Sequence, residues 1–143
     1  MGLISSASGN SIWRGYDYFT SKKVLSFKKI SKIEFEGIVQ GTKQYHVKID
    51  IDHPRKSSCD CPHAAGKRII CKHMVALYFE AFPKEASKLL KASEEYEKEE
   101  EERWAVHLEE IRQDVYSLSK KELQERLMDA LVSLEETDRY GRY

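Results

Sequence analysis

The sequence lacks any apolar run long enough to cross a membrane, and the mean hydropathy of its 143 residues is -0.63. Its first six residues, Met1 to Ser6, have neither the basic segment nor the apolar core of a signal peptide. There is no excess of one charge, because 24 Lys and Arg residues balance 24 Asp and Glu residues. These features predict a cytoplasmic protein without a membrane partner.

The sequence also lacks the short motifs by which several enzyme classes place their reactive groups. It has no glycine-rich phosphate-binding loop, no nucleophile elbow and no H-E-x-x-H helix. We therefore expect a binding or structural protein and no enzymatic activity.

Cysteine is scarce, and all three cysteines lie within fifteen residues. They form Cys59-Asp60-Cys61, a spacer of nine residues, and Cys71-Lys72-His73. Zinc prefers thiolate sulfur and imidazole nitrogen, and structural zinc sites use sets of three cysteines and one histidine. In each of the two pairs, Cys59 with Cys61 and Cys71 with His73, one residue separates the members. An extended or tightly turned backbone can therefore direct both side chains toward one ion. The pattern predicts one structural zinc ion held by Cys59, Cys61, Cys71 and His73.

Other interpretations of these residues remain open at this point. The cysteines could be buried small apolar side chains, or two of them could form a disulfide. Clustered Cys and His in a cytosolic chain favour a metal, and a disulfide between residues i and i+2 is strained. His53 and His63 compete with His73 for the fourth position. We favour His73 because it begins an apolar helix that would bury the site.

Around this pattern the sequence resembles the SWIM-type zinc finger, whose signature is C-x-C, a short spacer and C-x-H. The resemblance includes Cys71–Leu77, Arg14–Phe19, Val24, Gln40–Thr42 and Tyr45–Ile49. It covers residues 12–82, with Ser21–Lys23 in place of an expected glycine. It implies a zinc module that binds DNA or protein. Such modules are often beside or fused to Swi/Snf-type ATPases, and the relatives most like this chain are bacterial.

The alternation of apolar and polar residues predicts strands over 23–30, 32–39 and 45–51, paired as a small three-stranded antiparallel sheet. The expected register places Val39 opposite Tyr45 and Phe35 opposite Ile49. Residues 12–19 suit a short helix or turn. The helix after the metal is apolar over most of its circumference, so one side should pack on the sheet and the other on the C-terminal half. We therefore expect an α+β fold.

From Lys84 to Leu118 the pattern is helical and passes through Glu94–Glu102, where seven of nine residues are Glu. An apolar seam follows at spacings of four and three residues, and Ser119–Glu122 forms a capping box for a last helix. These features predict a C-terminal helical arm that folds as an antiparallel hairpin. The expected organisation is a zinc domain over 12–82, a helical extension over 83–137, and flexible tails over 1–11 and 138–143.

The zero net charge conceals a basic half and an acidic half. Residues 1–83 carry 13 Lys or Arg against 7 Asp or Glu, whereas residues 84–143 carry 11 against 17. Basic residues around the metal loop are candidates for phosphate contact. They are Arg55, Lys56, Lys67, Arg68 and Lys72.

Two functions fit this charge pattern. The first is a zinc module that binds nucleic acid, DNA in particular, or a protein partner such as a Swi/Snf-type ATPase. The alternative is a protein-interaction adaptor whose acidic arm recruits a basic partner or forms a dimer seam, without direct nucleic acid contact. We expect a monomer, because the seam would pack within the hairpin.

Overall fold

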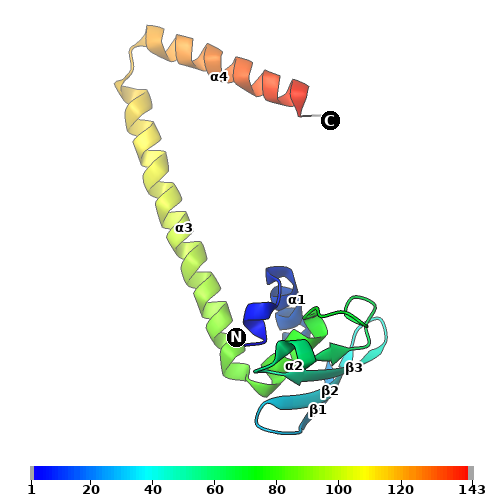
Figure 1. Cartoon of the computed structure of the whole chain (residues 1–143). Coiled ribbons are helices and arrows are strands. Elements are labelled where there is room, and N and C mark those ends of the chain that lie inside the picture. The colour runs from blue at the N-terminus through cyan, green and yellow to red at the C-terminus, as the bar shows by residue number, and fades with distance from the viewer. Residues whose placement is uncertain (1, 142–143) are drawn as a thin grey trace. The chain divides into compact units, whose positions relative to one another are not determined.

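The computed structural model describes residues 2–141 and has an α+β fold (Figure 1). It divides into two units, Met1–Ala92 and Ser93–Tyr143, and helix α3 runs from the first unit into the second. The elements follow in the order η1 (Ile4–Ser6), α1 (Gly9–Thr20), β1 (Val24–Lys29), β2 (Glu34–Gln40), β3 (Gln44–Asp50), η2 (Pro54–Lys56), β4 (Ser58–Cys59), α2 (Lys72–Ala81), α3 (Pro83–Ser117) and α4 (Lys120–Tyr140).

The sheet is antiparallel with strand order β1-β2-β3-β4, so each strand pairs with its neighbour in the sequence. The register of β2 and β3 is the predicted one, with Val39 opposite Tyr45 and Phe35 opposite Ile49. The prediction of three strands was wrong, because β4 pairs with β3 and places Cys59 opposite Val47. This fourth strand has only two residues, too few to show the alternation by which a strand is recognised in sequence.

Helix α2 forms the centre of the core and is covered on two sides. Gly37 of β2 lets the sheet approach it, because a Cβ there would lie 2.6 Å from Leu77 Cδ1. Gly15 of α1 has the same role on the other side, where a Cβ would lie 2.4 Å from Val75 Cγ1. The second apolar side of α2 therefore meets α1, whereas the sequence analysis assigned it to the C-terminal half. From the sequence we expected only a short helix or turn over residues 12–19, whereas α1 is a helix of 12 residues, Gly9–Thr20.

The first unit extends beyond residues 12–82 at both ends. Leu3 is fully buried, and Ser8 caps α1 by accepting a hydrogen bond from the amide of Ser11, so much of the predicted flexible tail over 1–11 is ordered. Ala86 and Leu89, in the first turns of α3, also pack on the core. At the other end α4 continues to Tyr140, and the last two residues of the predicted tail over 138–143 lie outside the described residues.

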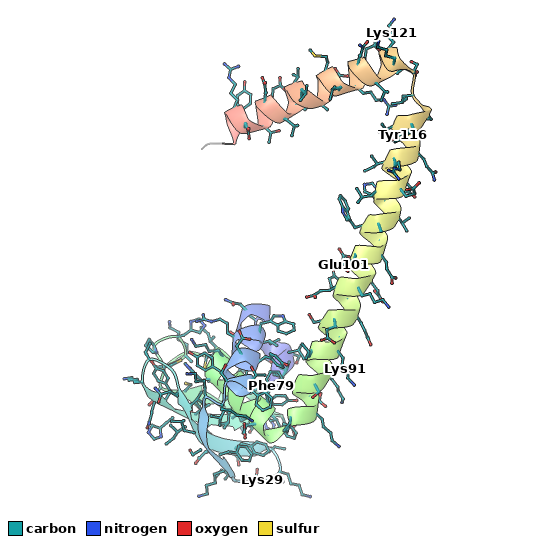
Figure 2. All side chains as sticks on the ribbon, turned by 180° about the vertical axis from the view of Figure 1, so that it is seen from behind. Lys29, Phe79, Lys91, Glu101, Tyr116 and Lys121 are labelled. Carbon is teal, nitrogen blue, oxygen red and sulfur yellow. The ribbon has the colours of Figure 1, made fainter. Side chains whose placement is uncertain are left out.

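The second unit contains the rest of α3 and all of α4, which we call the arm (residues 93–140). Ser119 and Glu122 form the predicted capping box at the start of α4. The predicted hairpin packing is absent from the described part of the arm, because its apolar side chains are exposed, including Trp104, Leu108 and Leu127. Figure 2 shows the side chains projecting from α3 around Glu101 and Tyr116. No helix among residues 2–141 is both long and apolar enough to span a membrane.

Candidate metal centre

Four buried side chains converge between β4 and the start of α2. Cys59 ends β4, Cys61 follows two residues later, Cys71 is the N-cap of α2, and His73 lies in the first turn of that helix. The four ligand atoms all lie within 4.8 Å of one another. His73 Nδ1 lies 3.8 Å from Cys59 Sγ and 3.8 Å from Cys71 Sγ. The structure thus brings the four predicted ligands together.

These distances suit a single metal ion. Zinc bonds of about 2.3 Å to sulfur and about 2.05 Å to nitrogen place the corners of a tetrahedron roughly 3.5 to 3.8 Å apart. All three cysteines are free thiols, so none is committed to a disulfide. Three sulfurs and one imidazole nitrogen, buried together at this spacing, fit the donor set that zinc prefers.

Residues 45–81 match the family model of the SWIM zinc finger. The matched segment runs from β3 to the end of α2 and contains all four grouped side chains. It is shorter than the resemblance over 12–82, because the match does not extend to α1, β1 and β2. No curated protein and no solved structure matches the chain. We call residues 45–81 the SWIM finger.

The electrostatics of the SWIM finger favour a cation among the sulfurs. The pKa of Cys71 is lowered, first because the Cys59 thiol donates a hydrogen bond to its sulfur. The His73 ring and the amides of the first turn of α2 add further hydrogen bonds to the same sulfur. The pKa of Cys59 is raised, because it shares this proton with Cys71 and is buried. A metal ion would replace the shared proton and stabilise both thiolates.

The turn between the first two cysteines is fastened to the sheet. Asp60 Oδ1 accepts a hydrogen bond of 2.9 Å from the amide of His46 in β3. After Cys61 the chain turns at once, because the carbonyl of Cys61 accepts hydrogen bonds from the amides of Ala64 and Ala65. These hydrogen bonds fix the position of the turn that carries Cys59 and Cys61 relative to β3.

The ring of His73 is held by aromatic packing. Its centroid lies 4.7 Å from the ring of Tyr45 and 5.4 Å from the ring of Tyr18. Gly41 leaves room for this packing, since a Cβ there would lie 3.0 Å from His73 Nε2. That nitrogen is buried and has no hydrogen-bond partner among the described residues. From the sequence, Tyr45 was predicted to lie opposite Val39, but none of these contacts with His73 was identified.

A second set of contacts, also missed from the sequence, orders the loop before β4. Asp50 Oδ1 accepts hydrogen bonds from the amides of Asp52 and His53, and the amide of Asp50 donates to Ser57 Oγ. Burial raises the pKa of Asp50, but the two hydrogen bonds from the amides of His53 and Asp52 to its carboxylate and the nearby His53 ring outweigh burial and lower the pKa overall. This loop leads directly to Cys59. A turn closed by an Asp side chain leaves only a weak signal in sequence.

The other two candidate histidines lie outside the metal group. His53 Nδ1 is 3.3 Å from Asp50 Oδ1, and the His53 side chain is 57% exposed. His63 is exposed and lines a cavity next to the metal group. The structure therefore groups His73 with the cysteines, as the sequence analysis favoured.

The candidate phosphate-binding residues divide into two sets. Arg55 and Lys56 at the end of η2, together with Arg68, line one surface cleft of about 590 Å³. Lys67 is absent from the described lining of this cleft. Lys72 points elsewhere, and its ammonium lies 4.6 Å from the centre of the Tyr18 ring. Three of the five predicted residues thus share one surface.

Proposed function

We propose that the SWIM finger holds one structural zinc ion through Cys59, Cys61, Cys71 and His73. The observation that carries this proposal is the buried group of three sulfurs and one imidazole nitrogen within 4.8 Å. When bound, the ion cross-links β4 and its turn to the start of α2. A small unit with a limited core gains much of its stability from such a link.

We also propose that the protein is not an enzyme. Catalytic zinc sites keep a position open for water or substrate, usually with three protein ligands. Four ligands from this chain would fill a tetrahedral shell. Cobalt substitution tests this, because a closed site gives a four-coordinate absorption spectrum that added anions leave unchanged, whereas an open site responds to them.

For the surface of the module we propose binding to nucleic acid, with DNA as the expected form. Arg55, Lys56 and Arg68 supply positive charge around one cleft, although Asp52 also lines it. Lys and Arg side chains that contact phosphates release counterions, so the affinity falls as salt rises. Three phosphate contacts would give a slope of about -2.7 in a plot of log affinity against log salt for duplex DNA.

Fluorescence anisotropy with a duplex of mixed sequence, repeated across salt concentrations, tests this surface. The triple variant Arg55→Gln, Lys56→Gln, Arg68→Gln should weaken binding and reduce the salt slope by about 2.7. A matched control removes the same charge elsewhere, with Lys28→Gln, Lys29→Gln and Lys32→Gln, and should retain more of the slope. Absence of binding at low salt, or equal effects of the two variants, contradicts the proposal.

A protein-interaction adaptor is the second candidate function, and the exposed apolar side chains of the arm favour it. As the resemblance implies, a Swi/Snf-type ATPase is one expected partner, in the cytoplasm. Affinity capture with the whole chain, with and without nuclease, separates the two functions. A partner that nuclease releases is held through nucleic acid, whereas one that resists nuclease is held by protein contact.

A further inference from the structure

The arm carries an apolar stripe that nothing in the described chain covers. The stripe consists of Trp104, Leu108, Ile111 and Val115 on α3 and Leu123, Leu127, Leu131 and Leu134 on α4. Their exposed fractions lie between 37% and 66%. Within residues 2–141, α4 has no buried residue and α3 has only Ala86, which belongs to the first unit. The arm therefore has no core of its own, although apolar residues at this spacing normally pack against another helix.

The area of the stripe suits an interface. Eight large side chains, each about half exposed, present roughly 600 to 800 Å² of mostly apolar surface, taking about 150 to 200 Å² for each whole side chain. This is at or above the upper end of the roughly 300 to 600 Å² found for the largest apolar patch on a monomeric protein. The four residues on α3 supply about half of this area, so the α4 residues must also join the interface for it to approach the roughly 800 Å² that each partner buries in a stable complex.

We propose that a second copy of this chain covers the stripe, with the two α3 helices antiparallel. One register pairs all four stripe residues of α3 with one another across the two copies. Trp104 then faces the partner copy's Val115, and Leu108 faces the partner copy's Ile111. The contact is related by a two-fold axis, so it closes on itself and gives a dimer.

The charges along the arm support the second copy and the antiparallel direction. The run Glu94–Glu102 precedes the stripe on α3, whereas Lys120 and Lys121 follow it at the start of α4. The register above brings Glu99 and Glu100 of each copy close to Lys120 and Lys121 of the other. A parallel pair would instead place the two Glu-rich runs side by side, which like-charge repulsion opposes.

Two other occupants fit the observations less well. Residues 93–143 carry 16 Asp or Glu against 8 Lys or Arg, so the arm repels nucleic acid. Helix α4 could fold back onto α3 of the same chain. However, where α4 and α3 do meet, Arg126 Nη1 pairs with Asp114 Oδ2 at 2.9 Å, and the stripe residues of both helices stay exposed. This proposal rests on the arm alone and is independent of the zinc site and of the basic cleft.

Molar mass in solution gives the first test, measured by light scattering during gel filtration of the zinc-loaded whole chain under reducing conditions. We expect twice the chain mass of 16.7 kDa. Leu108→Glu should raise the Kd of the dimer by roughly 30-fold or more, because it places a charge at the centre of the α3 part of the stripe. The matched control is Val106→Glu, at a side chain that is 62% exposed on the opposite face of α3, and it should remain dimeric.

Cross-linking tests the direction and identity of the partner. A carbodiimide joins a carboxylate directly to an amine, and a mixture of ¹⁴N- and ¹⁵N-labelled chains marks links between copies. We expect mixed-isotope links from Glu99 or Glu100 to Lys120 or Lys121. The charge reversal Lys120→Glu with Lys121→Glu should weaken the dimer several-fold, and Glu99→Lys with Glu100→Lys should restore it.

Circular dichroism would show whether Leu108→Glu disturbs the helix. If it does, the charge-reversal variants at Glu99, Glu100, Lys120 and Lys121 still test the dimer, because these side chains are exposed. A monomer of 16.7 kDa overturns the proposal. So do links confined to single chains, which mean that α4 folds back on α3. Equal effects of Leu108→Glu and Val106→Glu, or failure of the compensating charge reversal, overturn it as well.

Discussion

The ring of Tyr45 packs against the ring of His73, with 4.7 Å between their centroids. Tyr45 lies in β3 and His73 in the first turn of α2, so this contact joins the sheet to the helix beside the candidate metal centre. It fixes the direction of the imidazole, whose Nδ1 faces the sulfurs of Cys59 and Cys71. In many metal sites a hydrogen bond to the second ring nitrogen does this. Here aromatic packing does it.

Tyr45→Ala should therefore lower both stability and zinc affinity. The loss of a buried aromatic side chain costs about 3 to 5 kcal/mol in free energy of unfolding. Tyr45→Phe keeps the ring and loses the 2.7 Å hydrogen bond between the Tyr45 hydroxyl and Thr42 Oγ1, at a cost of about 0.5 to 1.5 kcal/mol. Urea unfolding and competition with a chromophoric zinc chelator measure the two effects.

Tyr116→Ala is the control for this pair, because Tyr116 is 80% exposed on α3. It should change neither the stability of the first unit nor the zinc affinity. If Tyr45→Ala retained zinc as tightly as Tyr45→Phe does, packing would not be what orients the imidazole.

Two glycines should resist substitution because backbone or core atoms occupy the space of a side chain. A Cβ at Gly15 would lie 2.4 Å from Val75 Cγ1, and a Cβ at Gly37 would lie 2.3 Å from the carbonyl oxygen of Ser26. Gly15→Ala and Gly37→Ala should each destabilise the first unit by about 1 to 3 kcal/mol. Gly9→Ala, which meets no atom within 4 Å, should be neutral or stabilising. Thermal unfolding of the three variants compares them directly, and equal melting temperatures would refute this account of the core.

Asp50 should stabilise the loop before Cys59 in a way that depends on its charge. Its pKa is lower in the folded state than the usual 3.8, so its contribution is complete well above that value and is lost as the pH falls through the folded pKa. Asp50→Asn should lower the free energy of unfolding by about 1 to 3 kcal/mol. The gap between the two proteins should narrow as the pH falls below the usual pKa and through the folded pKa of Asp50. A gap that stays the same size in strong acid would assign the effect to another group.

The choice of histidine at the metal centre has its own test. His73→Ala should lose zinc affinity and stability together, because it removes one of the four proposed ligands, all of which are buried. His63→Ala should bind zinc as the unaltered protein does, since His63 is exposed outside the group. Chelator competition under identical conditions ranks the two variants. The reverse ranking would mean that His63 replaces His73.

The parts of the structure that the sequence revealed are those encoded by residues close together. The spacing of Cys59, Cys61, Cys71 and His73 identified the metal group, and the alternation around Tyr45 fixed the register of two strands. The strand β4 escaped notice because its existence depends on pairing with β3 rather than on its own two residues. Burial of Leu3 and the packing of Tyr45 on His73 are likewise contacts between distant segments. No local pattern specifies them.

The arm shows a different limit. Its heptad-like spacing correctly indicated helices with an apolar seam, but the same spacing suits a partner within the chain or in another chain. From the sequence we predicted a hairpin within one chain and therefore a monomer. Exposure of Trp104, Leu108 and Leu127 removes the reason for that choice, and the dimer takes its place as the proposal.

The most direct test of the account is the zinc content of the whole chain, measured by elemental analysis after purification without chelator. The account predicts one zinc ion per chain, its loss in Cys71→Ser, and a matching fall in the free energy of unfolding, since metal binding and folding are coupled. Substoichiometric zinc in the unaltered protein, or a Cys71→Ser variant that keeps its zinc and its stability, would contradict it.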